Sequence, residues 1–380
     1  MKKFRSCVVL LVAVVLLLST FVPVLAHATT VNTSEDERNP YVTAYLNQLA
    51  EENGTQSYAV ENVDQDDTIA SLDNYYRKDC ELAELLQEMV TDGFNLSKVT
   101  SIEKDDKIDA MHYMAEMYLQ ISDADCLELI NDYFRRYAVD SGDSFAIEFY
   151  DTISEENNFR ELIVNTCAVG VATDKSALEE IVESQRSSVS TYSTASYDDN
   201  FSSTNAAEWA YDNYNKYSTD FPAFTGSYGS DCTNFVSQAL YNGGMEMHDT
   251  WYCTKLNDTY LIPESATQLD YSWKLADPSP WISVDEFVSF WGSKSTYYEY
   301  TKDEYLEDQM TAFAQPIMRG DVVILYSSTL WWSSPAHAMI ISQYDAANYD
   351  YLLAAHSRER RDYPLSTAIT SYAKVRFYCP

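Results

Sequence analysis

The sequence predicts an α+β protein, in which an acidic, mostly helical N-terminal domain precedes a C-terminal domain that packs a helix against an antiparallel sheet. Three observations support this prediction. Apolar residues recur at three- and four-residue intervals through much of the N-terminal half. A short helical stretch follows Cys232, and continuous apolar runs typical of buried strands follow Asp321 and His337. All seven tryptophans lie in the C-terminal half, which indicates a separate aromatic core.

The N-terminus has the pattern of a secretory leader. Basic residues within the first five positions precede an apolar run from Val8 to Leu18, and Ala26 and Ala28 provide the small residues of a cleavage site. The run is too short to span a membrane, which takes about 20 residues. We therefore expect residues 1–28 to be a signal peptide, and the mature protein to be secreted or loosely associated with the cell wall, with no membrane span after cleavage.

Charge and cysteine content exclude several classes of function. The chain has 59 acidic and 25 basic residues, a formal net charge of −34, and such a surface repels nucleic acid. Of the seven cysteines, Cys7 leaves with the leader, and the others form no CxxC pair of the zinc or thioredoxin type. We therefore expect no cysteine-based zinc site and no thioredoxin-type redox site. One disulfide, Cys253–Cys379, remains an open alternative to free thiols.

Composition divides the mature chain into four segments. Residues 29–63 are polar and acidic and are predicted to form a flexible lead-in. Residues 64–186 form the mostly helical domain, although FAIEFYDTI (145–153) and FRELIVNTCAVGVAT (159–173) have the β-branched and aromatic content of strands. Residues 187–204 are rich in Ser and Thr, which is typical of a linker. Residues 205–380 then form the second domain.

The stretch GSDCTNFVSQALYNGG, residues 229–244, predicts a helix that begins at a cysteine. Asp231 or Ser230 can cap this helix, and the double glycine ends it. Cys232 then lies in the first turn, where unpaired N–H groups and the helix dipole favour a thiolate, the nucleophilic form of cysteine. Its backbone N–H could also donate to an oxyanion. The alternative is a buried cysteine that fills a gap between helix and sheet.

A catalytic thiol requires a base, and a histidine opens one of the predicted strands. His337 begins the run HAMII, which places its ring to meet a helix N-terminus across a cleft. The next predicted strand ends near His356, so adjacent antiparallel strands can put the two histidines side by side, with His356 orienting His337. Asp345 and Asp362 are alternative orienting groups. Each histidine could instead be a packed polar residue.

The string DCTNFVSQ (231–238) is followed by a double glycine, and GDVV (320–323), HAMII (337–341) and HS (356–357) come later in the chain. In this order the motifs resemble the putative amidase domain family of Gram-positive bacteria, over residues from roughly 197 to 380. That family is similar to NlpC-type and CHAP-type peptidoglycan hydrolases, which have a papain-like α+β fold. The resemblance implies that Cys232 is the nucleophile, His337 the base and His356 the orienting residue. Asp231 and Gln238 match the motif and are candidates for substrate or oxyanion contacts.

The implied reaction is cleavage of an amide bond in peptidoglycan or in a peptide, through an acyl-enzyme and without a metal or cofactor. Other classes remain open. The chain could be a non-catalytic binding or structural protein of the cell surface that retains the fold, or it could transfer the acyl group to an amine. The stretch WWSSPAH (331–337) is longer and more aromatic than the resemblance leads us to expect before the base.

Overall fold

The structure is a computed structural model of the 380-residue chain. It describes residues 39–55, 67–153 and 200–379, apart from 88, 90–93, 119–120, 122, 227 and 293. The predicted signal peptide, most of the predicted linker and the stretch 159–173 lie outside the described residues. The described residues all belong to one compact unit. Among the described helices, none is both long and apolar enough to cross a membrane.

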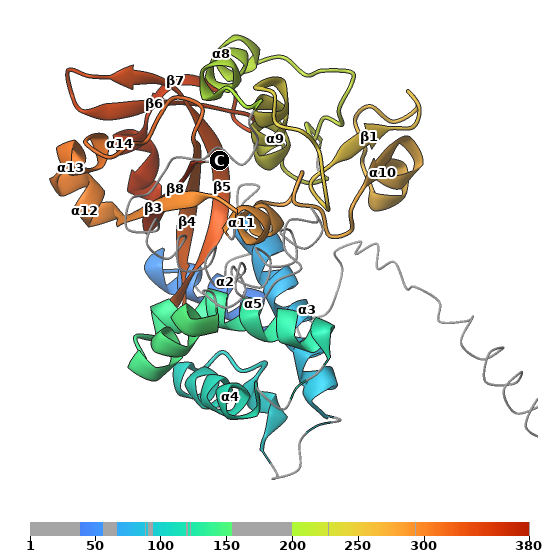
Figure 1. Cartoon of the computed structure of the whole chain (residues 1–380), viewed down its shortest axis with the longest axis vertical. Coiled ribbons are helices and arrows are strands. Elements are labelled where there is room, and N and C mark those ends of the chain that lie inside the picture. The colour runs from blue at the N-terminus through green and yellow to red at the C-terminus, as the bar shows by residue number, and fades with distance from the viewer. Residues whose placement is uncertain are drawn as a thin grey trace, which may run out of the picture. The chain divides into compact units, whose positions relative to one another are not determined.

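The N-terminal part of this unit is helical (Figure 1). Its elements are α2 (Pro40–Glu52), α3 (Asp67–Gln87), the 3-10 helix η3 (Leu96–Lys98), α4 (Lys104–Met117), α5 (Ala124–Ser141) and a helix over residues 144–153. Each long helix buries one face. In α3 the buried apolar residues Leu72, Tyr75, Leu82 and Leu86 recur at helical spacing. These faces meet in one hydrophobic core, which we call the helical core.

Two segments of the N-terminal part differ from the sequence prediction. The predicted flexible lead-in contains α2, in which Asn39 accepts a hydrogen bond from the backbone N–H of Tyr41 and Pro40 occupies the first turn. The stretch 145–153 is a helix rather than a strand. Ala146 and Ile153 are buried while Phe145 is 45% exposed, so helical spacing, not the β-rich composition, matches the buried face.

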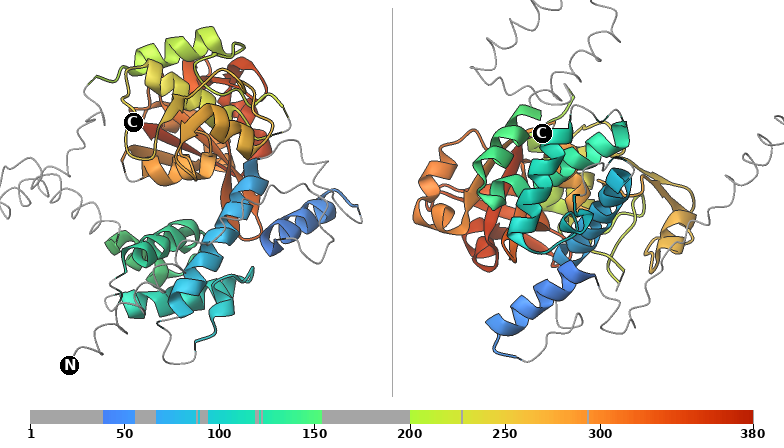
Figure 2. Two further views of the ribbon diagram at one scale, coloured as in Figure 1. Left: turned by 90° about the vertical axis from the view of Figure 1, so that its right-hand side faces the viewer. Right: turned by 90° about the horizontal axis from the view of Figure 1, so that it is seen from below.

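The C-terminal part is built on a six-stranded antiparallel sheet in the order β3-β8-β4-β5-β6-β7. Figures 1 and 2 show these strands in orange and red beside the helices of the same part of the chain. The strands are β3 (Thr296–Thr301), β4 (Val322–Thr329), β5 (Trp332–Asp345), β6 (Asp350–Ala355), β7 (Arg360–Pro364) and β8 (Lys374–Cys379). The α+β class predicted from the sequence agrees with this arrangement.

Helices cover both faces of this sheet. Alternate residues of β4 and β5 belong to different cores: Ile324 and Ala338 pack on one face, and Val323 and Met339 on the other. Burial on both faces explains why these strands read as continuous apolar runs. The helices of the first face are α8 (Ser203–Asn213), α9 (Cys232–Asn242) and α11 (Val284–Gly292), and those of the second are α12 (Lys302–Glu307), α13 (Gln309–Phe313) and α14 (Leu365–Ala368), which the 3-10 helix η5 (Ile369–Ser371) follows.

The first face carries the aromatic core that the tryptophan content predicts. Trp251, Trp281 and Trp291 are fully buried, with Trp251 within 4.8 Å of Trp281 between ring centroids. A small two-stranded sheet of β1 (Cys253–Lys255) and β2 (Trp273–Leu275) lies beside it, with α10 (Ala266–Ser272) between the two strands in the chain. Cys253 and Cys379 are free thiols, so the open alternative of a disulfide between them is not found.

The turn between β4 and β5 enters the helical core. Trp332 is 2% exposed and packs edge-on against Tyr41 and Tyr137, and Trp331 donates from its indole Nε1–H to the carbonyl of Ile102. The backbone N–H of Ser333 donates to Asp140 at 2.8 Å. The aromatic stretch that precedes His337 therefore attaches the central sheet to the N-terminal helices.

Candidate active site

Cys232 is the first residue of α9, and its side chain has no exposed surface. The N–H groups of the first turn lack partners within the helix and favour a negative charge nearby. Asp231 is the N-cap residue, but its carboxylate does not cap the helix. It accepts hydrogen bonds from the backbone N–H of Phe224 and from Nδ2 of Asn234, both at 2.9 Å. Asp231 thus occupies the predicted N-cap position, and its carboxylate joins the preceding loop to Asn234 in the first turn of α9.

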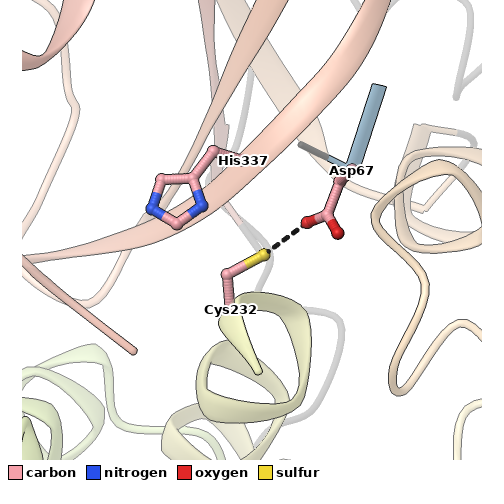
Figure 3. Close-up of side chains that lie close together, drawn as sticks. All are labelled: Asp67, Cys232 and His337. Atoms are coloured by element: carbon pink, nitrogen blue, oxygen red, sulfur yellow. Dashed lines mark hydrogen bonds between the residues drawn. The ribbon is translucent and has the colours of Figure 1, made fainter. Parts of the chain in front are cut away.

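His337 lies in β5, where the strand pairing is irregular. His337 pairs with Leu325 of β4. The register shifts at the next pair, where Tyr326 lies opposite Pro335. A β-bulge of this kind bends the strand and can turn a side chain toward a neighbouring site. A ligating atom of the His337 ring lies within 4.8 Å of the sulfur of Cys232 (Figure 3). The structure thus brings together the two residues that the sequence pairs.

Asp67, the first residue of α3, is the third member of this cluster. Its Oδ2 atom lies 2.8 Å from Sγ of Cys232 and accepts the hydrogen bond of the thiol (Figure 3). Its carboxylate is also within 4.8 Å of His337. Asp67 is not recognisable as a site residue from the sequence, because it is 165 positions before Cys232 in a segment rich in acidic residues. Only its position at a helix start distinguishes it there.

The structure does not bring His356 to His337. Nδ1 of His356 lies 2.6 Å from Oδ2 of Asp231, and Nε2 lies 3.1 Å from the carbonyl oxygen of Asn213. The ring stacks on Phe235 with centroids 4.1 Å apart. Because both ring nitrogens are engaged in this way, the expected orienting role toward His337 is contradicted by geometry. His356 instead holds Asp231, the residue directly before the nucleophile candidate.

The remaining candidates occupy other positions in the fold. Gln238 is buried in α9 six residues after Cys232, which places it about 120° around the helix. Asp345 ends β5 and accepts from Nδ2 of Asn348 at 2.7 Å. Asp362 lies on β7 with its side chain 46% exposed. The acidic residue grouped with Cys232 and His337 is Asp67, and not Asp345 or Asp362.

The same three side chains are chemically able to hold a metal ion, since each offers one ligand atom and the three atoms lie within 4.8 Å of one another. The distance from Cys232 to Asp67 argues for a hydrogen bond instead. Two ligands of a tetrahedral zinc, at about 2.3 Å for sulfur and about 2.0 Å for oxygen, lie about 3.5 Å apart. The observed 2.8 Å between Sγ and Oδ2 is shorter.

A hollow in the protein surface lies outside the cluster of Asp67, Cys232 and His337. It has a volume of about 990 Å³ and is lined by charged residues of α3, α5 and α11 and of the sheet, among them Lys78, Asp132, Glu286 and Arg376. Neither Cys232 nor His337 lines it. Lys78 pairs there with Glu286 at 2.9 Å, so the hollow marks where α3 is bound to α11.

Comparison with known proteins agrees with the class of site. Residues 200–379 match the family model described as a putative amidase domain. This part of the chain therefore belongs to the putative amidase domain family, and the match indicates an amide-bond hydrolase. No curated protein and no solved structure matches the chain. The helices before residue 200 lie outside the matched range.

Proposed function

We propose that this chain is a secreted cysteine hydrolase that cleaves amide bonds in peptidoglycan or in a related peptide. One observation carries the proposal: the sulfur of Cys232, at the start of a helix, lies within 4.8 Å of the imidazole of His337 on the central sheet. A cysteine-bearing helix packed on an antiparallel sheet that bears the histidine is the arrangement expected of a papain-like fold.

The first half of the reaction forms an acyl-enzyme. His337 accepts the thiol proton, and the sulfur of Cys232 attacks the carbonyl carbon of the substrate amide. The backbone N–H of Cys232 and the start of α9 stabilise the negative oxygen of the tetrahedral intermediate. The C–N bond breaks when the His337 imidazolium gives its proton to the departing amine. A thioester between the substrate acyl group and Cys232 remains.

The second half releases the acid. A water molecule takes the place of the amine, and His337 accepts its proton as the oxygen attacks the thioester carbonyl. The C–S bond then breaks, and the sulfur recovers the proton from His337. An amine in place of water would give acyl transfer, which the same two residues could perform.

Two sequence features support a cell-wall substrate. The leader pattern of residues 1–28 directs the chain out of the cytoplasm. The net charge of −34 disfavours nucleic acid and anionic membrane as partners and is compatible with cationic wall components. Peptidoglycan is the abundant extracellular polymer with many amide bonds, so we expect hydrolysis at one of its muramoyl–peptide or stem-peptide bonds.

Digestion of purified peptidoglycan by the wild-type protein and by Cys232→Ala tests the proposal. We expect new amine and carboxyl ends in the wild-type digest, identified by mass spectrometry, and none with Cys232→Ala, because that variant lacks the thiol that forms the thioester. Cys253→Ala is the matched control, since Cys253 is a buried cysteine of the same domain. Identical digests from wild type and Cys232→Ala would contradict the cysteine mechanism. Addition of a primary amine distinguishes hydrolysis from acyl transfer.

A further inference from the structure

We propose that α3 is an intramolecular cover of the active site, and that Asp67 holds Cys232 in its unreactive thiol form until α3 moves away. This inference rests on the proposed function, because it concerns access to the same nucleophile. It assigns a role to the N-terminal helices, which lie outside the amidase domain.

The contact between Asp67 and Cys232 opposes catalysis. A thiol that donates to a carboxylate at 2.8 Å keeps its proton, and a thiolate at that distance would face a second negative charge. Among the three side chains in Figure 3, the hydrogen bond of Asp67 goes to the sulfur.

Access to the sulfur is also blocked. Cys232 has no exposed surface, and the attacked carbonyl carbon must reach contact distance of Sγ, about 3–3.5 Å, before reaction. The carboxylate of Asp67 already occupies one approach at 2.8 Å. Substrate binding therefore requires that Asp67 be displaced.

Further contacts hold α3 along the sheet beyond Asp67. Thr68 hydrogen bonds to Ser327 of β4 at 3.0 Å, and Ser71 donates to the carbonyl of Pro335 of β5, also at 3.0 Å. Pro335 is two residues before His337, so α3 is bonded to the strand that carries the base.

The next turns of α3 reach α11. Asn74 donates to Glu286 at 2.8 Å, and Lys78 pairs with Glu286 at 2.9 Å. Lys78 also lies 3.6 Å from Asp132 of α5, and its side chain is about one-tenth exposed. Because these charges are buried, loss of one partner would leave the other charge without compensation. The ion pairs therefore fix α3 both to the amidase domain, through Glu286, and to its helical neighbour α5, through Asp132.

The tryptophan turn fixes the helical core to the same strand. Trp331, just before β5, and Trp332, its first residue, lie in or against the helical core, six and five residues before His337. Movement of the helical part would therefore release α3 from the sulfur and also free the turn that leads to the base. One displacement would open both halves of the site.

The test compares full-length wild type with Asp67→Ala and Asp67→Asn, and with Glu81→Gln as the matched control. Glu81 is an exposed acid of the same helix that pairs with Arg77. The rate of alkylation of Cys232 by iodoacetamide is measured under native conditions by peptide mass spectrometry. The buried thiol of Cys253 reports global unfolding. Hydrolysis of purified peptidoglycan is measured on the same samples.

We expect Asp67→Ala to raise the alkylation rate of Cys232 about tenfold or more, with a parallel rise in hydrolysis, because a like charge and a steric block are both removed. Asp67→Asn should give a smaller rise, since it removes the charge but keeps the bulk. Glu81→Gln should match wild type, and Cys253 should stay protected in all variants.

Two results would separate this inference from the proposed function. Wild-type or slower alkylation in Asp67→Ala, with a fall in hydrolysis, would overturn the cover and make Asp67 an assisting group. Faster alkylation with no hydrolysis by any variant would support the cover and count against the hydrolase. Should Asp67→Ala fail to fold, Ser71→Ala removes the bond to Pro335 and leaves Asp67 intact. Faster alkylation of Cys232 is again expected, and an unchanged rate contradicts the cover.

Discussion

Replacement of His337 by glutamine is expected to lower kcat/KM for amide hydrolysis by about 10²–10⁴-fold, the usual contribution of a general acid–base group. Glutamine is of similar size but neither accepts the thiol proton nor returns it to the leaving amine. The measurement is kcat/KM on a soluble peptidoglycan fragment across pH 5 to 9.

A second histidine provides the control for this variant. His112 lies in α4, where Nε2 is 2.8 Å from Asp143, and its side chain is 43% exposed. His112→Gln should keep the wild-type kcat/KM and its pH profile. Equal kcat/KM for His337→Gln and wild type at every pH would show that the imidazole near Cys232 is not the base.

Asp79→Asn is expected to lower the free energy of unfolding by about 3–5 kcal/mol, the usual cost of removing one partner from a buried ion pair. Asp79 is fully buried in the helical core, where it lies 2.8 Å from Nζ of Lys107 and 2.7 Å from the guanidinium of Arg136. It also accepts from the hydroxyl groups of Tyr41 and Tyr137. Asparagine keeps the shape but removes the carboxylate that pairs with Lys107 and one of the two that pair with Arg136, which keeps Asp132.

The pH dependence of stability gives this variant a distinct signature. Burial lowers the pKa of Lys107 from 10.5 to about 8, against the opposing effect of Asp79. Loss of the Asp79 charge should lower this pKa further. Between its folded pKa and 10.5, Lys107 binds a proton in the unfolded chain but not in the folded one. Its contribution to stability therefore rises with pH over a range that begins at a lower pH in Asp79→Asn than in wild type.

Denaturant unfolding at several pH values measures both effects. The control is Asp109→Asn, at an exposed acid that pairs with Lys98, for which we expect a change within about 0.5 kcal/mol. The same small loss of stability in both variants, or the same pH dependence of stability in Asp79→Asn and wild type, would contradict the described ion cluster.

The pairing of Cys232 with His337 could be predicted because each side chain lies in a strong local pattern, and the order of these patterns resembles that of the putative amidase domain family. A loop, a cysteine and a helical stripe define the start of α9, and an apolar run defines β5. Both patterns depend on neighbours within about ten residues. Placement of these two elements together follows because a helix with one apolar face must pack on the sheet.

The role of Asp67 could not be predicted, because it depends on a contact between distant segments and not on a local pattern. Its partner is 165 positions away, and the acidic composition around it gives no pattern that distinguishes one carboxylate from another. The double tryptophan was visible as an unusual feature before His337, but its partners Tyr41 and Tyr137 belong to a distant segment. Contacts between segments far apart in the chain leave little trace in a single sequence.

His356 was misassigned because strand order alone does not fix which groups a ring nitrogen meets. The sequence places His356 at the end of the strand next to that of His337, as the structure does. The buried carboxylate of Asp231 and the carbonyl of Asn213 then determine its partners. Asn213 is the last residue of α8, and Asp231 directly precedes α9. The contacts of His356 with both residues therefore depend on the packing of α8 against α9.

The central claim is that the sulfur of Cys232 forms the covalent bond to substrate, and rapid acid quench of a reacting mixture tests it most directly. The protein is mixed with a soluble peptidoglycan fragment, and peptides are then analysed by mass spectrometry. The account predicts an acyl group on the peptide that contains Cys232, removable by hydroxylamine and absent in Cys232→Ala. Product formation at the same rate in Cys232→Ala, with no acyl group on wild-type Cys232 at any quench time, would contradict the account.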